Sequence, residues 1–401
     1  MSSVEANALE LYEIPEGFVI MDKMCFSIVA LITIVSFCFS QEAVTIARLP
    51  AGTAPASVAI AEVNRDGKND IIVASSGSND VTVLLGDGTG RFTQSKGSPF
   101  PAGNSPNDIA VGDFNGDERV DLAFSNHETD YITVLIGDGK GRFLPAPGSP
   151  VPVQSQPHPH GIAAADFNGD AKLDLVVEST RDDKVEILFG NGGGGFETPG
   201  PLFVVGRRPY PKVRTSDLNR DGKADIITTD GRGNTVTVLI GDGKGGFSAA
   251  NGSPFAVARS PFGVALGDIN ADTNPDLIVI HYSGNITNAQ HDGLTILTGD
   301  GRGAFTVAAG SPFAVGRAPV SVAVGDINGD GILDAATANM GSNDVSVILG
   351  GRHTFTAAAG SPFQVGAHPS GVAVGDLNGD GKADIVVANS QDNDVTVLFS
   401  K

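Results

Sequence analysis

Short apolar segments alternate with polar, glycine-rich segments through residues 43–401, and the same order of segments recurs about every fifty residues. In the last repeat the apolar segments are 371–375 (GVAVG), 384–388 (DIVVA) and 394–399 (DVTVLF). Segments of this length, rich in Val and Ile and bounded by Gly, Asn and Asp, are typical of β-strands. No segment keeps a helical period over several turns. The pattern therefore predicts an all-β protein built from repeated units.

The composition of the strands indicates where each one lies in its sheet. The first strand of a unit is short and rich in Gly and Ala, which suits a crowded interior position. The fourth follows a Gly-rich turn and carries a Gly-Ser-Pro segment, and because proline cannot donate to a sheet ladder it belongs at an edge. These prolines are Pro99, Pro150, Pro254, Pro312 and Pro362. Seven such units predict a seven-bladed β-propeller with four antiparallel strands per blade.

The two ends of the repeat region complement each other. The seventh unit stops after its third strand, and the region begins with one extra strand at about 43–52 (AVTIARLPAG). Leu49 in this segment takes the place that Phe363 has before the last unit. We therefore expect the N-terminal strand to complete the last blade and to close the ring.

An acidic nonapeptide lies between the first and second strands of every unit, as in 376–384 (DLNGDGKAD). Side-chain oxygens stand at its positions 1, 3, 5 and 9, and hard cations such as Ca²⁺ take six to eight oxygen ligands in loops of this kind. We predict up to seven structural calcium sites. The candidate ligands are Glu62, Asn64, Asp66, Asp70, Asp113, Asn115, Asp117, Asp121, Asp166, Asn168, Asp170, Asp174, Asp217, Asn219, Asp221, Asp225, Asp268, Asn270, Asp272, Asp276, Asp326, Asn328, Asp330, Asp334, Asp376, Asn378, Asp380 and Asp384.

Position 6 of the nonapeptide is glycine in four copies, where a sharp turn favours a residue without a side chain. Glu118, Ala171 and Thr273 stand there in the other three copies, so we expect those loops to be more strained or slightly different in structure.

The nonapeptides resemble those of the FG-GAP/VCBS repeats, which build the propellers of integrin α-subunits and many secreted bacterial proteins. The resemblance covers about residues 43–401, and its strongest part is the match at Asp376, Asn378, Asp380 and Asp384 and their counterparts. It implies a seven-bladed propeller with calcium on one rim and partner binding on the opposite rim. Glu62 replaces the usual first Asp, which weakens the expectation for the first site.

The N-terminal residues do not follow the repeat. Residues 1–20 form a polar, acidic extension, and one interpretation places the start of translation at Met21 or Met24. Residues 21–40 combine Lys23, an apolar run and small residues before Gln41, which is typical of a secretory signal peptide. An uncleaved anchor is the alternative. Cleavage would leave residues 41–401 as a secreted propeller without cysteine and without a transmembrane segment.

The formal net charge of −20 excludes nucleic acid and anionic membranes as main partners. Three carboxylates in each nonapeptide supply much of this charge, so bound divalent ions would offset most of it. Absence of tryptophan removes the side chain best suited to stacking on sugars. We expect a monomer.

The rim opposite the nonapeptides carries the side chains typical of recognition surfaces, namely Arg, Tyr and His. Its candidate ligand-binding residues are His127, Tyr131, His158, His160, Arg207, Arg208, Tyr210, Arg259, His281, Tyr282, His291, Arg317 and His368. The alternative is that variable residues collect here because turn chemistry fixes the other rim. We predict a secreted, calcium-binding module for adhesion to an extracellular protein or glycan. An extracellular enzyme, such as a polysaccharide lyase or hydrolase, and an inert spacer are the other hypotheses; no nucleophile–base pair favours an enzyme.

Overall fold

The computed structural model describes residues 45–401 except 128, 155–157, 180, 283, 285–291 and 353. The predicted N-terminal extension (1–20) and signal peptide (21–40) lie outside these residues. Within the described part of the chain, no helix is long and apolar enough to span a membrane.

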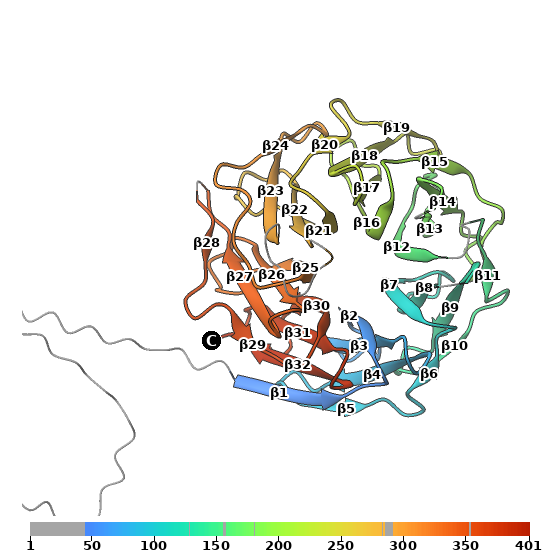
Figure 1. Ribbon diagram of the computed structural model, residues 1–401. Helices are drawn as coiled ribbons and strands as arrows, with labels where there is room; N and C mark the ends of the chain where they lie inside the picture. The colour runs from blue at the N-terminus through green and yellow to red at the C-terminus, as the bar shows by residue number, and fades with distance from the viewer. Residues whose placement is uncertain are drawn as a thin grey trace, which may run out of the picture. The chain divides into compact units, whose positions relative to one another are not determined.

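The described residues form seven antiparallel sheets arranged in a ring, with no helix among them (Figure 1). This confirms the predicted seven-bladed propeller. The first three blades contain β2 (Pro55–Ala61), β3 (Asp70–Ser75), β4 (Asp80–Gly86), β5 (Phe92–Gln94) and β6 (Phe100–Pro101); β7 (Pro106–Gly112), β8 (Asp121–Asn126), β9 (Tyr131–Gly137), β10 (Phe143–Pro145) and β11 (Val151–Pro152); and β12 (Pro159–Ala165), β13 (Asp174–Ser179), β14 (Lys184–Leu188) and β15 (Leu202–Val204).

The other four blades repeat the same strand order. They contain β16 (Pro209–Ser216), β17 (Asp225–Asp230), β18 (Thr235–Gly241), β19 (Phe247–Ala249) and β20 (Phe255–Ala256); β21 (Pro261–Gly267), β22 (Asp276–His281), β23 (Gly293–Gly299) and β24 (Phe305–Val307); β25 (Pro319–Gly325), β26 (Asp334–Asn339), β27 (Asp344–Leu349), β28 (Thr356–Ala357) and β29 (Phe363–Gln364); and β30 (Pro369–Gly375), β31 (Asp384–Asn389), β32 (Asp394–Phe399) and β1 (Thr45–Pro50).

The first strand of each blade lines the centre of the ring, where β2 lies between β7 and β30 (Figure 1). The second strand is buried on both faces, because each sheet is covered by the sheets of two neighbouring blades. The core therefore lies between blades: Val83 of one sheet packs in the same cluster as Leu122 and Phe124 of the next. Small residues on the inner strands allow seven sheets to converge around the centre.

The N-terminal strand closes the ring as predicted. β1 pairs antiparallel with β32, with Leu49 opposite Val395, so the last blade is built from both ends of the repeat region. Arg48 of β1 forms ion pairs with Asp392 and with Asp394, the latter at 2.8 Å. The predicted segment, about 43–52, contains the observed strand.

The fourth strands lie at the outer edge of their sheets, as predicted, but the prolines expected within them lie between strands. In four blades this strand is divided into two short pieces that both pair with the third strand, as β19 and β20 do with β18. The serine before the proline bridges the gap: Val238 N–H donates to the hydroxyl of Ser253 at 2.9 Å, and Val83 donates likewise to Ser98. The hydroxyl thus satisfies a ladder donor that the interrupted backbone leaves unpaired.

Candidate metal loops and a histidine–arginine cavity

The seven acidic nonapeptides connect the first and second strands of the blades, so all seven lie on one rim. The ninth residue of each loop is fully buried at the start of the second strand. In the last loop, Asp384 accepts hydrogen bonds from the amide of Leu377 at 2.9 Å and from the amide of Ser400 at 3.0 Å. This carboxylate therefore ties the loop to the end of the third strand.

The oxygens at positions 1, 3 and 5 turn toward the backbone of their own loop. Asp376 accepts the amide of Gly379 on Oδ1 at 2.7 Å and the amide of Gly381 on Oδ2 at 2.9 Å. The side-chain oxygen of Asn378 accepts the amide of Asp380 at 2.9 Å. In the first loop, Glu62 receives the amide of Asn64 on a single oxygen, Oε1. The loop backbone thus fixes the positions of these oxygens.

The sixth loop position has a positive φ in all seven copies. Glu118, Ala171 and Thr273, the three residues that are not glycine, have φ of 61°, 64° and 74°. A residue with a Cβ pays an energetic cost in this left-handed region. The strain expected from the sequence is therefore confirmed in these three loops.

The loop carboxylates repel one another. Burial and, to a smaller extent, the nearby charges of Asp66 and Glu62 raise the pKa of Asp70 to about 6, against the lowering effect of two backbone amides. The pKa of Asp121 is also raised to about 6, again mainly by burial. A bound cation would offset this repulsion. The donors are all oxygen, the set that Ca²⁺ takes in proteins, so the residues present fit that ion.

Six of the predicted ligand-binding residues meet on the opposite rim. They line a cavity of about 500 Å³ formed by blades 2, 3 and 4. The lining residues are His127, His158, His160, Arg207, Arg208 and Tyr210, together with Arg181, Asp183 and Arg232, which were not among the predicted residues. The signal for these three is their place in second-to-third strand connections, on the same rim as the others.

The remaining candidates lie elsewhere. Tyr131 accepts the amide of Asn104 on its hydroxyl at 3.1 Å. His281 is fully buried in β22, 2.8 Å from the hydroxyl of Thr295, and burial lowers its pKa to about 4. Tyr282 is linked to the cavity through Phe262, whose ring contacts both Tyr282 and Tyr210 at 5.3 Å.

Three predicted residues come from other parts of the rim, and one lies outside the described residues. Arg259, Arg317 and His368 lie in the crossings that lead into blades 5, 6 and 7. His291 is among the residues that the structure does not describe.

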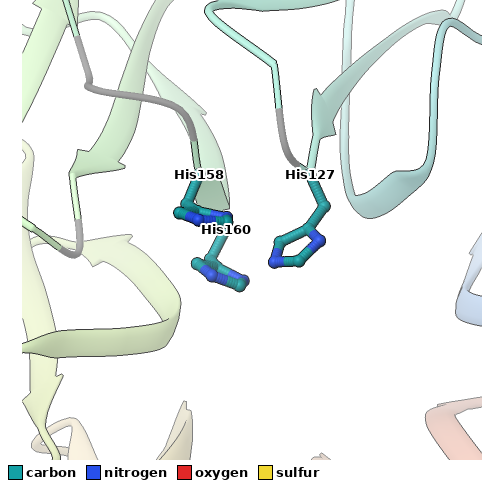
Figure 2. A group of neighbouring side chains, drawn as sticks. All are labelled: His127, His158 and His160. Atoms are coloured by element: carbon teal, nitrogen blue, oxygen red, sulfur yellow. The ribbon is translucent and has the colours of Figure 1, made fainter.

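The three histidines of the cavity lie beside one another, as Figure 2 shows. His127 follows β8, His158 immediately precedes β12, and His160 is the second residue of β12. The ring of His127 is 4.9 Å from that of His158 and 4.5 Å from that of His160, measured between centroids. Tyr210 packs edge-on against His160 at 4.4 Å. Two neighbouring blades thus supply one group of imidazoles.

The sequence matches the FG-GAP-like repeat over residues 62–124, 116–177, 217–279 and 326–387, more than half of the chain. The chain belongs to the FG-GAP-like repeat family. Mouse integrin alpha-IIb is 30% identical to it over 228 residues, which cover 48% of this chain and 21% of the integrin. The matched region therefore spans about a fifth of the length of the integrin.

Solved structures share the fold of this FG-GAP propeller at low sequence identity. BBS1N, in a complex with ARL6DN, aligns with a TM-score of 0.56 at 13% identity, covering 88% of this chain and 94% of that one. A virginiamycin B lyase from Staphylococcus aureus aligns with a TM-score of 0.53 at 16% identity, covering 90% and 100%. Identities this low establish a common propeller architecture and nothing about activity.

The cavity of the FG-GAP propeller is positively charged although the whole chain is acidic. Four arginines line it, whereas Asp183 is the one carboxylate among its described lining residues. Asp183 also accepts the backbone amide of Arg208 at 2.6 Å. The guanidinium of Arg208 lies 5.9 Å from the ring centre of Tyr210. Such a concave, cationic surface favours a ligand that carries negative charge.

Proposed function

We propose that this FG-GAP propeller is an extracellular or cell-surface binding module that calcium stabilises. Its partner is a protein or glycan that presents a carboxylate, sulfate or phosphate group. The observation that carries the proposal is the cavity on the rim opposite the acidic loops, lined by Arg181, Arg207, Arg208 and Arg232. Arginine is the side chain best suited to paired hydrogen bonds with such groups.

Calcium has a structural role in this proposal. The buried ninth carboxylate joins each loop to the second and third strands, as Asp384 does between Leu377 and Ser400. An ion on the oxygens of positions 1, 3, 5 and 9 would fix this junction in every blade. The ligand surface lies at the other end of the blades. Calcium therefore supports the ligand site by keeping the blades in place.

An array of glycans and extracellular-matrix proteins, probed with and without calcium, tests the proposal. We expect saturable binding to acidic members of the array, weakened by salt because the contacts are charged. The full chain with Arg207→Ala should bind at least about tenfold more weakly. Arg317→Ala is the matched control, because Arg317 precedes the inner strand of blade 6 as Arg207 precedes that of blade 4.

Two results would contradict the proposal. Absence of any saturable ligand in calcium would favour an inert spacer. Equal losses in Arg207→Ala and Arg317→Ala would mean that the ligand binds around the whole rim and not in the cavity.

A further inference from the structure

Three imidazoles from two blades lie close enough to share one bound ion. The candidate nitrogen atoms of His127, His158 and His160, one per ring, all lie within 4.8 Å of one another. Nitrogens around a tetrahedral zinc ion lie about 3.4 Å apart, given bonds of about 2.0–2.1 Å. Binding of one ion would therefore require the nitrogens to approach one another by at most about 1.4 Å. Figure 2 shows the ring of His127 facing the other two.

The backbone at His158 differs from the repeat. In the other six blades the residue before the inner-strand proline has φ between 49° and 55°; these residues are Ala54, Ser105, Arg208, Ser260, Ala318 and His368. His158 holds the same repeat position with φ of 141°. An uncommon conformation at one copy of a repeated position is typical of a functional site. With this backbone conformation, the ring of His158 lies beside that of His127.

Unpaired ring nitrogens suit coordination. His160 is 5% exposed. Nδ1 of His158 and Nδ1 of His160 are buried and have no hydrogen-bond partner among the described residues. A buried nitrogen without a partner is unfavourable, and an ion bound at Nδ1 of His160 would remove that cost.

We propose that His127, His158 and His160 bind a divalent transition-metal ion of the zinc class. Imidazole nitrogen is a preferred ligand of Zn²⁺, Co²⁺, Ni²⁺ and Cu²⁺, whereas Ca²⁺ takes oxygen, so this ion is chemically distinct from those of the seven loops. Three protein ligands leave one coordination position open, as in zinc sites that bind a further molecule. This site goes beyond the proposed function, which does not require it.

The surrounding arginines determine how the site would behave. Their charges oppose a cation, and Nη2 of Arg181 lies 2.9 Å from Nε2 of His158, where it competes for the nitrogen lone pair. The same charges favour an anion as the fourth ligand of the ion. Binding of the metal should therefore be stronger with a coordinating anion present, and removal of the Arg181 charge should also strengthen it.

Titration of the full chain with Co²⁺ in excess calcium tests the site. Calcium fills the oxygen loops, and a nitrogen-ligated tetrahedral Co²⁺ gives visible absorption that an octahedral oxygen site gives only weakly. We expect one equivalent to saturate this absorption and Zn²⁺ to displace it. His127→Ala and His158→Ala should each weaken Co²⁺ binding at least about tenfold. His368→Ala is the matched control, because His368 holds the repeat position of His158 in blade 7.

The arginine provides a second measurement with the opposite sign. Arg181→Gln should bind Co²⁺ about tenfold more tightly than the unchanged chain, since a positive charge next to the ion is lost. Thermal melts of the variants confirm that each is folded. The proposal is overturned if the absorption is absent, if it persists undiminished in both histidine variants, or if Arg181→Gln binds more weakly. Absence of Co²⁺ binding would not contradict the proposal of an acidic partner, because the array experiment uses no transition metal.

Discussion

The sixth residue of each acidic loop has a positive φ, whether or not it is glycine. Ala171 has φ of 64° and Gly381 has φ of 86°. A Cβ at Gly381 would meet no atom within 4 Å, so backbone conformation alone decides the cost. We expect Ala171→Gly to raise the free energy of unfolding by about 1 kcal/mol and Gly381→Ala to lower it by a similar amount. Denaturant unfolding in calcium measures both; a change of the same sign in both would contradict this account.

A buried aspartate at the end of β17 gives the fold a specific pH dependence. Burial raises the pKa of Asp230 to about 6 from an ordinary value of 3.8, against hydrogen bonds from Thr237, Thr235 and Thr228. Between about pH 4 and 6 the folded chain keeps a proton that the unfolded chain has lost. The free energy of unfolding therefore falls as pH rises through this range, and it stays lower above pH 6.

Substitution of this residue tests the effect. Blades 2, 6 and 7 carry Asn126, Asn339 and Asn389 at the place of Asp230, so Asp230→Asn fits the repeat. We expect this variant to be more stable than the unchanged chain by up to ~3 kcal/mol at pH 7 and about equally stable below pH 4. Urea unfolding at several pH values measures the difference. A difference that does not change with pH would refute the ionisation argument.

The sequence predicted the acidic loops and only part of the cavity. The loop ligands lie within nine consecutive residues, so their spacing alone indicates a common site. The cavity combines residues from three blades that the ring brings together, and no local pattern indicates which ones meet. Arg181 and Arg232 were missed for this reason. His281 lies on the same rim by sequence, but its ring is buried next to Thr295.

At the scale of elements, the closing strand β1 has one face against the core and one in solvent. Leu49 packs against the cluster between the first and last blades, whereas Ile46 is 54% exposed. We expect Leu49→Ala to lower the free energy of unfolding by about 1–2 kcal/mol and Ile46→Ala to change it by less than about 0.5 kcal/mol. Equal effects in denaturant unfolding would mean that β1 does not pack as the structure shows.

Strand order was predictable because each strand type has its own composition, whereas the division of the fourth strand into two pieces was not predicted. In four blades this strand consists of two short pieces, because the proline of the Ser-Pro pair has no amide to donate. The serine hydroxyl then accepts the hydrogen bond that a backbone carbonyl would otherwise accept, as when the amide of Val134 donates to Ser149 at 3.0 Å. This replacement of a backbone acceptor by a serine hydroxyl depends on the position of the neighbouring strand, which the sequence of the segment itself does not indicate.

At the scale of the whole molecule, the ring has seven similar loop junctions and a single closure. Because the blades form one closed ring, loss of calcium from all seven junctions would lower the stability of the whole ring. With a dissociation constant near 0.1 mM in millimolar calcium, each occupied loop would add about 1.4 kcal/mol, and seven would add up to ~10 kcal/mol. That sum is comparable with the net stability of a typical protein, about 5–15 kcal/mol.

Removal of calcium should consequently destabilise the entire propeller. We expect excess EDTA to lower the melting temperature by more than about ten degrees and restored calcium to reverse the change. EDTA already saturated with calcium controls for non-specific effects. The variant His127→Ala should show the same shift, since the loops and the histidines are separate sites. A melting temperature that EDTA leaves unchanged would show that the carboxylates hold their loops through backbone amides alone, as Asp376 does with Gly379 and Gly381.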